Sequence, residues 1–208
     1  MTKVISKLYP TYERAQAAVR DLEAAGVSSS DISIVSNNSD NWFSKNGSPK
    51  RVDRDGDGVD DRAEGAGAGA GIGATVGGAA GLLAGLGLLA IPGVGPVVAA
   101  GWLVATAAGA AAGGLTGGII GALTQAGVSE EDAHVYAEGV RRGGTLVTAR
   151  VDESRQAEAE AILKSSNWVD PSARRRTYEE GGWKSFDPAL DPYTADQIAE
   201  DRARYPRV

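Results

Sequence analysis

The residue types and spacing best suited to chemistry lie in an acidic segment, Asp53–Glu64. Carboxylates occupy the first, third, fifth, ninth and twelfth positions of this twelve-residue stretch, and Gly58 occupies the sixth. Because Ca²⁺ takes six to eight oxygen ligands, a loop with this pattern can wrap its oxygens around one ion. The sequence therefore predicts a calcium site whose ligands are Asp53, Asp55, Asp57, Val59, Asp61 and Glu64.

The same segment has a second interpretation, as a solvated acidic linker. Asp60 stands where an EF-hand usually has an apolar residue, and Asn46–Lys50 is poorly suited to form an entering helix. Both interpretations are therefore open. Calcium is the one cofactor that the sequence suggests.

Other signals of chemistry are few. The chain has no cysteine and a single histidine, His134, which we expect to be an exposed or hydrogen-bonded helix residue. We find no nucleophile elbow, phosphate loop or acid–base pair, so we do not expect an enzyme. The net charge of −6 comes without a basic stripe, which argues against nucleic acid as a partner. Arg174–Arg176 could contact anionic headgroups, but a solvated run of charge is the simpler interpretation.

A long uncharged stretch dominates the middle of the chain. Charged side chains end at Glu64 and resume at Glu130. Glycines recur in it every four residues, and residues four apart lie on one face of a helix. With a turn at Ile91–Pro96, the pattern predicts a Gly/Ala-rich helical hairpin over residues 65–128, packed through its glycine stripes. The helix-packing positions are Gly69, Gly73, Gly77, Gly81, Gly85, Gly109, Gly113, Gly117 and Gly121.

Two environments could bury such a hairpin. As a helix, its first half would be ~40 Å long, enough to cross a hydrocarbon core of ~30 Å. We therefore expect a homo-oligomer that inserts into a lipid membrane from the cytoplasmic side of the inner membrane, since Met1–Lys7 lacks the apolar core of a secretory signal. The alternative is a soluble hairpin buried in a protein core or an oligomer. The most apolar part surrounds the turn, which predicts a membrane tip at Leu86, Leu89, Ile91, Val94 and Trp102.

The flanking segments predict an α+β fold. Helices are expected after the first and third of four strands, and the order βαββαβ is the split pattern of a ferredoxin-like sandwich. Two helices would then cover one face of the sheet. The hairpin and a helix that starts at Ser129 would be inserted between the second and third strands. The expected strands are Val4–Leu8, Ile32–Ser36, Thr145–Val151 and a short one near Trp168.

These elements divide the chain into five parts. Residues 1–36 and 129–170 form the two halves of the ferredoxin-like domain, separated by an acidic linker (37–64) and the hairpin (65–128). We expect residues 171–208 to form a flexible C-terminal tail, because they are rich in Pro, Gly and charge. Their aromatic residues favour some docking on a neighbour; these are Trp183, Phe186 and Tyr193. Trp42 and Phe43 in the linker are expected to pack locally, with a partner or membrane surface as the alternative.

Three segments, Val4–Ala15, Asp31–Val35 and Val128–Val147, resemble bacterial general stress proteins with a heat-induced YflT-type domain. The glycine-rich centre resembles that of family members with a glycine-zipper insertion. The resemblance implies a stress-response role and a ferredoxin-like fold, and it implies no defined reaction. We therefore expect a non-enzymatic stress-type protein that is membrane-associated and self-assembling. The alternative is a soluble calcium- or ligand-binding regulator that oligomerises through the hairpin.

Overall fold

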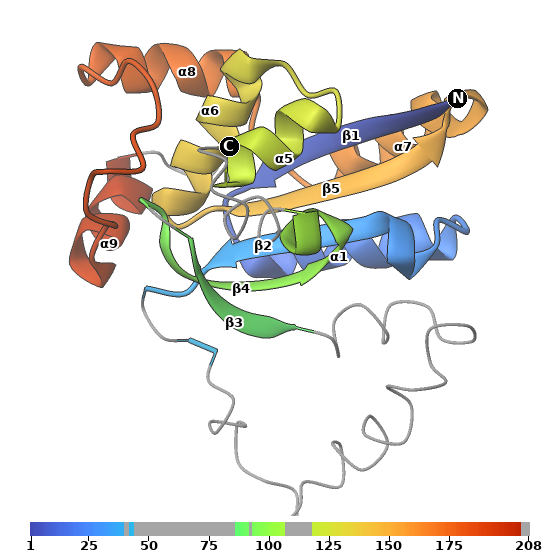
Figure 1. Ribbon diagram of the computed structural model, residues 1–208, viewed down its shortest axis with the longest axis horizontal. Coiled ribbons are helices and arrows are strands. Elements are labelled where there is room, and N and C mark those ends of the chain that lie inside the picture. Colours follow the sequence, from blue (N-terminus) through green and yellow to red (C-terminus); the bar gives the residue numbers. More distant parts are fainter. Residues whose placement is uncertain (40–41, 44–85, 92, 107–117, 205–208) are drawn as a thin grey trace, which may run out of the picture.

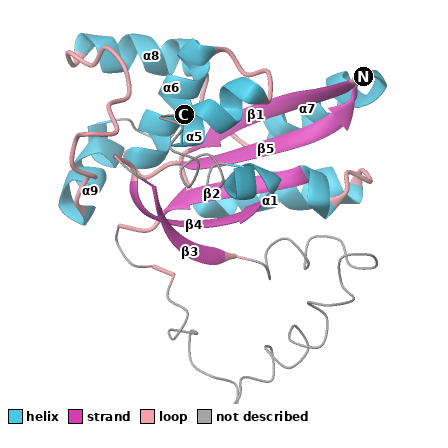
Figure 2. Cartoon of the chain, viewed as in Figure 1, coloured by secondary structure: helices cyan, strands magenta, loops and turns pink. Residues whose placement is uncertain are grey.

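The computed structural model of the chain describes residues 1–39, 42–43, 86–91, 93–106 and 118–204. Its centre is a five-stranded antiparallel sheet in the order β1-β5-β2-β4-β3 (Figures 1 and 2). Because β5 lies between β1 and β2, a strand late in the chain joins the two earliest ones. The strands span Thr2–Tyr9 (β1), Ile32–Asn37 (β2), Gly87–Ile91 (β3), Gly95–Gly101 (β4) and Thr145–Asp152 (β5).

One face of the sheet is covered by helices α1 (Tyr12–Ala24) and α7 (Gln156–Ser165). Thr11 begins α1 because its side-chain oxygen accepts a hydrogen bond from the Arg14 backbone N–H. Short 3₁₀ turns lead into β2 and α7, at Ser29–Asp31 and Glu153–Arg155. The apolar side of α1 consists of Ala15, Ala18, Val19 and Leu22, which are all buried and fall at helical spacing.

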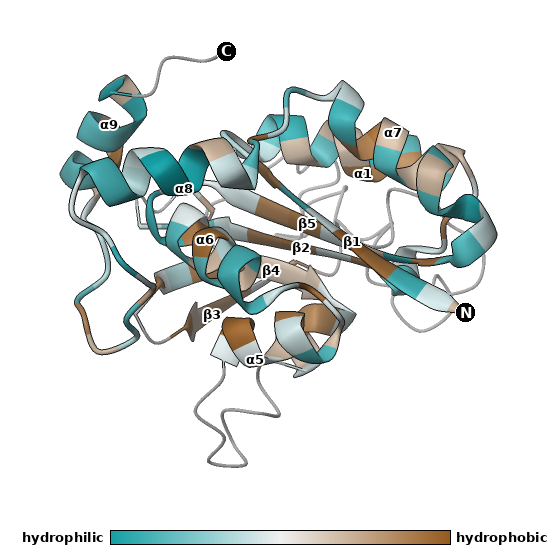
Figure 3. Cartoon of the chain, turned by 90° about the horizontal axis from the view of Figure 1, so that it is seen from above, coloured by the Kyte–Doolittle hydropathy of each residue, from teal (hydrophilic) through white to brown (hydrophobic). Residues whose placement is uncertain are grey.

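The opposite face is covered by helices α5 (Gly118–Gln125) and α6 (Glu130–Arg141), so the sheet lies between two helical layers (Figure 3). Ser129 begins α6 by accepting a hydrogen bond from the Asp132 backbone N–H at 3.2 Å. Gly139 allows α6 to approach β1, since a Cβ there would lie 2.3 Å from Leu8 Cδ2. The core on this side includes Leu8, Val35, Val97, Ile119, Leu123, Tyr136, Val140 and Leu146.

The C-terminal residues form two further helices, α8 (Pro171–Glu180) and α9 (Ala195–Arg204). Asp170 begins α8 by accepting hydrogen bonds from two backbone N–H groups, and Pro171 follows at the first helical position. Tyr178, Phe186 and Ile198 are buried. The predicted flexible tail is therefore wrong for residues 171–204, because its spaced aromatic and aliphatic residues bury enough surface to order the chain, as docking predicts.

The predicted α+β class is confirmed, and three of the predicted strands correspond to β1, β2 and β5. The predicted helices correspond to α1, α6 and α7. The strand expected near Trp168 is reduced to a single bridge between Leu8 and Val169, in which the Val169 N–H donates to the Leu8 carbonyl at 2.8 Å. The predicted helix boundaries therefore hold better than the predicted fourth strand.

The helical prediction is wrong for Gly87–Ile91 and Gly95–Gly101, which are the paired strands β3 and β4. β4 extends the sheet from β2, with Val35 opposite Ala99. Gly95 and Gly101 have φ values of +98°, which a regular helix does not contain. Val97 and Val98 favour an extended backbone because they are β-branched, and this local preference prevails over the four-residue glycine period.

The predicted membrane tip lies in this corrected region. Ile91 and Val94 are buried, and Leu89 and Trp102 pack against the same core. Leu86 packs against the core on the opposite face of the sheet. Trp102 also donates a hydrogen bond from Nε1 to the Asp31 carbonyl at 3.1 Å. Within the described ranges, no helix combines the length and the apolar character needed to cross a bilayer.

Most of the predicted helix-packing glycines lie outside the described residues: Gly69, Gly73, Gly77, Gly81, Gly85, Gly109, Gly113 and Gly117. Gly121 lies within α5. In the described part of the chain, a Cβ built on Gly121 would meet no atom within 4 Å.

Candidate functional site

A cavity of ≈ 500 Å³ lies where the junction of β1 and α1 meets the end of α6 and the C-terminal helices. Four separate parts of the sequence line it, so the completed fold is needed to form it. They comprise residues 8–13, Ser36 with Trp42, Gly139 with residues 142–144, and Val169 with parts of α8 and α9. The lining includes Tyr9, Tyr12, Glu13, Trp42, Arg142, Arg174, Tyr178, Asp201, Arg202 and Ala203.

Aromatic rings form one wall of the cavity. The Tyr12 and Trp42 rings lie 4.7 Å apart between centroids, at an interplanar angle of 41°. Trp42 Nε1 donates to the Asn37 carbonyl at 2.8 Å, which fixes the indole at the end of β2. Asn38 exchanges two hydrogen bonds with the Phe43 backbone, both 2.9 Å long. The expected local packing of Trp42 and Phe43 is thus confirmed, and Trp42 also faces the cavity.

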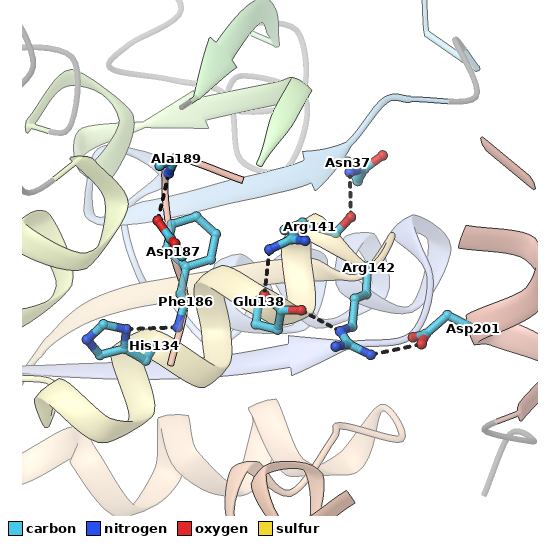
Figure 4. A network of polar contacts seen from close by, with 9 residues as sticks. All are labelled: Asn37, His134, Glu138, Arg141, Arg142, Phe186, Asp187, Ala189 and Asp201. Carbon is cyan, nitrogen blue, oxygen red and sulfur yellow. Dashed lines mark hydrogen bonds and ion pairs between the residues drawn. The ribbon is translucent and has the colours of Figure 1, made fainter. Parts of the chain in front are cut away.

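Arg142 is the centre of a polar network at the opposite wall (Figure 4). Its Nε donates to Glu138 Oε1 at 2.6 Å, and its Nη1 donates to Asp201 Oδ1 at 3.0 Å. The Glu138 side chain is 1% exposed. Burial alone would lower the pKa of the Arg142 guanidinium, but its hydrogen bond to Glu138 and the charge of that carboxylate raise the pKa above its usual value. The network therefore holds Arg142 charged and ties α6 to α9.

Two tyrosine rings complete the environment of Arg142. Its guanidinium carbon lies 4.3 Å from the Tyr178 ring centroid and 5.2 Å from that of Tyr193. Both distances are within the range of cation–π attraction. Burial raises the pKa of the Tyr178 hydroxyl above its usual value, so Tyr178 stays neutral and acts as an aromatic surface. The C-terminal residues are thus held to α6 by rings as well as by charge.

Gly143 allows α9 to lie close to the end of α6. It has a φ of +91°, and a Cβ there would lie 2.4 Å from Ile198 Cγ2. Arg202 Nη2 donates to the Gly143 carbonyl at 2.8 Å. Gly143 follows the end of α6, and its small size and positive φ let α9 pack there.

The segment between α8 and α9 packs on the turn that joins β3 to β4. A Cβ on Gly93 would lie 2.6 Å from Pro188 Cα, and one on Gly95 would lie 2.6 Å from Pro192 Cβ. The Phe186 backbone N–H donates to His134 Nδ1 at 3.2 Å (Figure 4). This bond confirms the expectation that His134 is a hydrogen-bonded helix residue.

The predicted calcium ligands lie outside the described residues: Asp53, Asp55, Asp57, Val59, Asp61 and Glu64. In the described part of the chain, no group of three or more His, Cys, Asp or Glu side chains is placed to hold a metal ion. The calcium site therefore stays a prediction from the sequence.

The residues that form the cavity were not recognised as a site from the sequence. Arg142 falls within the predicted second half of the ferredoxin-like domain, and Asp201 and Arg202 fall within the predicted tail. The predicted solvated run at Arg174–Arg176 divides instead: Arg174 lines the cavity, while Arg175 pairs with Glu131 and Asp132 at 2.6 and 3.1 Å. The one sequence signal was the set of aromatic residues in the tail, which indicated docking without saying where.

Comparison with known proteins finds no matching family model, curated protein or solved structure. The resemblance to general stress proteins therefore stays a prediction from the sequence.

Proposed function

We propose that this chain is a non-enzymatic binding protein of the general stress type, whose folded domain takes a small ligand in the cavity between α6, α9 and the β1–α1 junction. The observation that carries the proposal is the cavity itself, of ≈ 500 Å³ and lined from four parts of the chain. Small-molecule sites are concave, have volumes of roughly 300–1,000 Å³, and combine aromatic walls with a few placed polar groups. The cavity has each of these features.

A ligand screen by NMR tests this proposal on the full-length, ¹⁵N-labelled protein. Compounds of acidic, basic and neutral classes should include at least one that shifts the amide signals of Gly143, Gly144 and Ala203, which line the cavity. Ala203→Trp should abolish the shifts by filling the cavity. The matched control is Ala199→Trp, an exposed position on the same helix that does not line the cavity. Shifts that persist in Ala203→Trp, or none with any compound, would contradict the proposal.

We also propose that the domain has a ferredoxin-like core with an insertion. The order β1-β5-β2 is the one that the first three strands of that fold adopt, and the Leu8–Val169 bridge stands where its fourth strand would pair with β1. On this view β3, β4, α5 and α6 belong to the insertion between β2 and β5. β4 and β3 extend the sheet beyond β2, and α5 and α6 cover the face that α1 and α7 leave open.

A second candidate function, self-assembly with membrane association, is favoured by the glycine period. Glycines recur every four residues from Gly69 to Gly85, outside the described residues and without any charged side chain among them. Such stripes allow close helix–helix contact.

Gly77→Leu should therefore reduce the oligomer size measured by light scattering, whereas Ala79→Leu, which lies off the stripe, should leave the oligomer size unchanged. Flotation of the full-length protein with liposomes tests the membrane part, and a protein that never floats would exclude it.

A further inference from the structure

We infer that β3 is an interaction surface whose partner is a second copy of this chain, so that two sheets join edge to edge through antiparallel β3 strands. β3 is the last strand in the sheet order, and within the described residues no strand pairs with its outer side (Figure 1). A strand at a sheet edge presents unpaired N–H and C=O groups, and another chain can add a strand there. β3 does not line the cavity, so this interface is separate from the proposed ligand site.

The hydrogen bonds of β4 indicate which backbone groups of β3 point outward. The Asn38 N–H donates to the Pro96 carbonyl at 2.8 Å, so the Pro96 backbone is directed toward β2 and not toward β3. Ala90 lies opposite Pro96 in the β3–β4 pair, which is therefore a non-hydrogen-bonded position of the ladder. The N–H and C=O of Ala90 thus point away from β4. Because backbone direction alternates along a strand, those of Leu88 do the same.

These two outward-facing residues lie on either side of Leu89, which makes the edge complementary to itself. When two copies are related by a twofold axis at Leu89, Leu88 of each copy lies opposite Ala90 of the other. Each of these two pairs then exchanges both of its N–H···O=C bonds. A closed twofold dimer requires one self-complementary patch on each copy, and this register supplies it.

The side chains of β3 suit contact with a second apolar strand. Leu88 is 39% exposed and Ala90 is also exposed, whereas Leu89 points to the other face and packs against the core. In the twofold register, Leu88 of one copy lies beside Ala90 of the other, a cross-strand pair that occurs twice. Pairing would therefore bury aliphatic surface that a single copy leaves in water.

Charge favours a second copy as the partner and β3 as the place of contact. The chain carries a net charge of −6, so two copies repel one another unless they meet at an uncharged surface. No charged residue lies between Glu64 and Glu130, so two β3 strands can pair without placing like charges opposite each other. A basic partner segment would find no carboxylate on β3 to pair with.

The opposite edge of the sheet, at β1, is protected against such pairing. Lys3 and Lys7 lie on this strand, in ion pairs of 3.4 and 3.8 Å. The Leu8 carbonyl already accepts a hydrogen bond from the Val169 N–H on the outer side of β1. Lysines and covering segments are two means by which proteins block edge pairing. β3 contains no lysine, and no segment in the described ranges pairs with its outer side.

Disulfide cross-linking tests both the pairing and its register, because the chain has no cysteine. Leu89→Cys would place two thiols opposite each other at the twofold axis. Non-hydrogen-bonded partners have Cα atoms about 4.5 Å apart, within the range of a disulfide. Mild oxidation of the full-length protein should therefore convert most Leu89→Cys chains to a covalent dimer. The matched control, Leu88→Cys, should give at most a tenth as much, since its thiols would be offset by about 7 Å along the strands.

A change at Ala90 tests the backbone hydrogen bonds. Ala90→Pro removes an N–H that points outward, so it should spare the pairing with β4 and weaken the dimer at least tenfold in analytical ultracentrifugation. Ala90→Val keeps the N–H and favours an extended backbone, so its dimer should be at least as tight as that of the unchanged chain. Both are measured in chains that also carry Gly77→Leu, so that the glycine stripe does not contribute. Thermal unfolding checks that both variants fold.

Three results would overturn the inference: no covalent dimer from Leu89→Cys, as much dimer from Leu88→Cys, or equal dimer affinity in Ala90→Pro and Ala90→Val. Amide hydrogen exchange identifies a different occupant. A monomer in which the Leu88 and Ala90 amides are protected would mean that the edge is covered within one chain, which also overturns the inference. Ligand binding in the cavity should be the same in all of these variants, so the proposed function is tested separately.

Discussion

Arg142→Met is expected to lower the free energy of unfolding by about 3 kcal/mol, because it leaves the buried Glu138 carboxylate without its nearest partner. Glu138 is 1% exposed and lies 2.6 Å from Arg142 Nε (Figure 4). Arg141 Nη1 stays near the other Glu138 oxygen, at 3.4 Å, which holds the loss to the low end of the range for broken buried pairs. Urea unfolding followed by circular dichroism measures the effect.

The matched control for this change is Arg176→Met, on the exposed side of α8. It should alter the free energy of unfolding by no more than about 0.5 kcal/mol, as is usual for surface positions. A loss below about 1 kcal/mol for Arg142→Met would mean that the network around Glu138 contributes little. The same variant should also loosen α9, detected as faster amide exchange at Ile198 and Asp201.

Gly101→Ala is expected to destabilise the protein by about 3 kcal/mol or more, through backbone strain and overlap together. Gly101 has a φ of +98°, and a Cβ there would lie 2.2 Å from the Ile32 carbonyl oxygen. This contact is with backbone and cannot be relieved by turning a side chain. The prediction also distinguishes the β4 strand from the helix that the sequence predicts here. In a regular helix, the same Gly-to-Ala change would stabilise the helix by about 1 kcal/mol.

Gly121→Ala is the control for this second prediction. Gly121 lies within α5, and the described part of the chain offers no atom within 4 Å of its Cβ. The change should therefore stabilise the protein, by up to about 1 kcal/mol. Thermal unfolding of both variants gives the comparison. Stabilisation by Gly101→Ala would contradict the β4 strand and restore the helical hairpin.

The parts of the fold that could be predicted have strong local signals. Ala15, Ala18, Val19 and Leu22 repeat at helical spacing, and Thr11 and Ser129 are good N-caps, so α1 and α6 could be placed closely. The strand expected at Thr145–Val151 corresponds to β5. The β3–β4 hairpin was missed because its apolar run also satisfied a helical period. Pairing with β2, a long-range contact, decides between the two structures.

The site was harder to predict than the fold. Arg142, Asp201 and Arg202 are ordinary helix residues in the sequence, and their proximity depends on α9 returning to the end of α6. At that end Gly143 has a positive φ, a backbone conformation that the sequence alone does not reveal. Trp42 joins them through a hydrogen bond to the end of β2. Tertiary contacts of this kind leave no periodic pattern along the chain.

The position of β5 between β1 and β2 has a consequence for synthesis on the ribosome. Thr2 pairs with Asp152 and Ser36 pairs with Thr145, so the two earliest strands lack the strand between them until roughly 100 further residues have been added. At about 5–20 residues per second, this delay is on the order of 5–20 s. During it the nascent chain exposes the unpaired backbone N–H and C=O groups of two strands, together with the charge-free stretch as it is synthesised. A chaperone or a membrane surface that meets the emerging chain would do so in this interval, before the sheet closes.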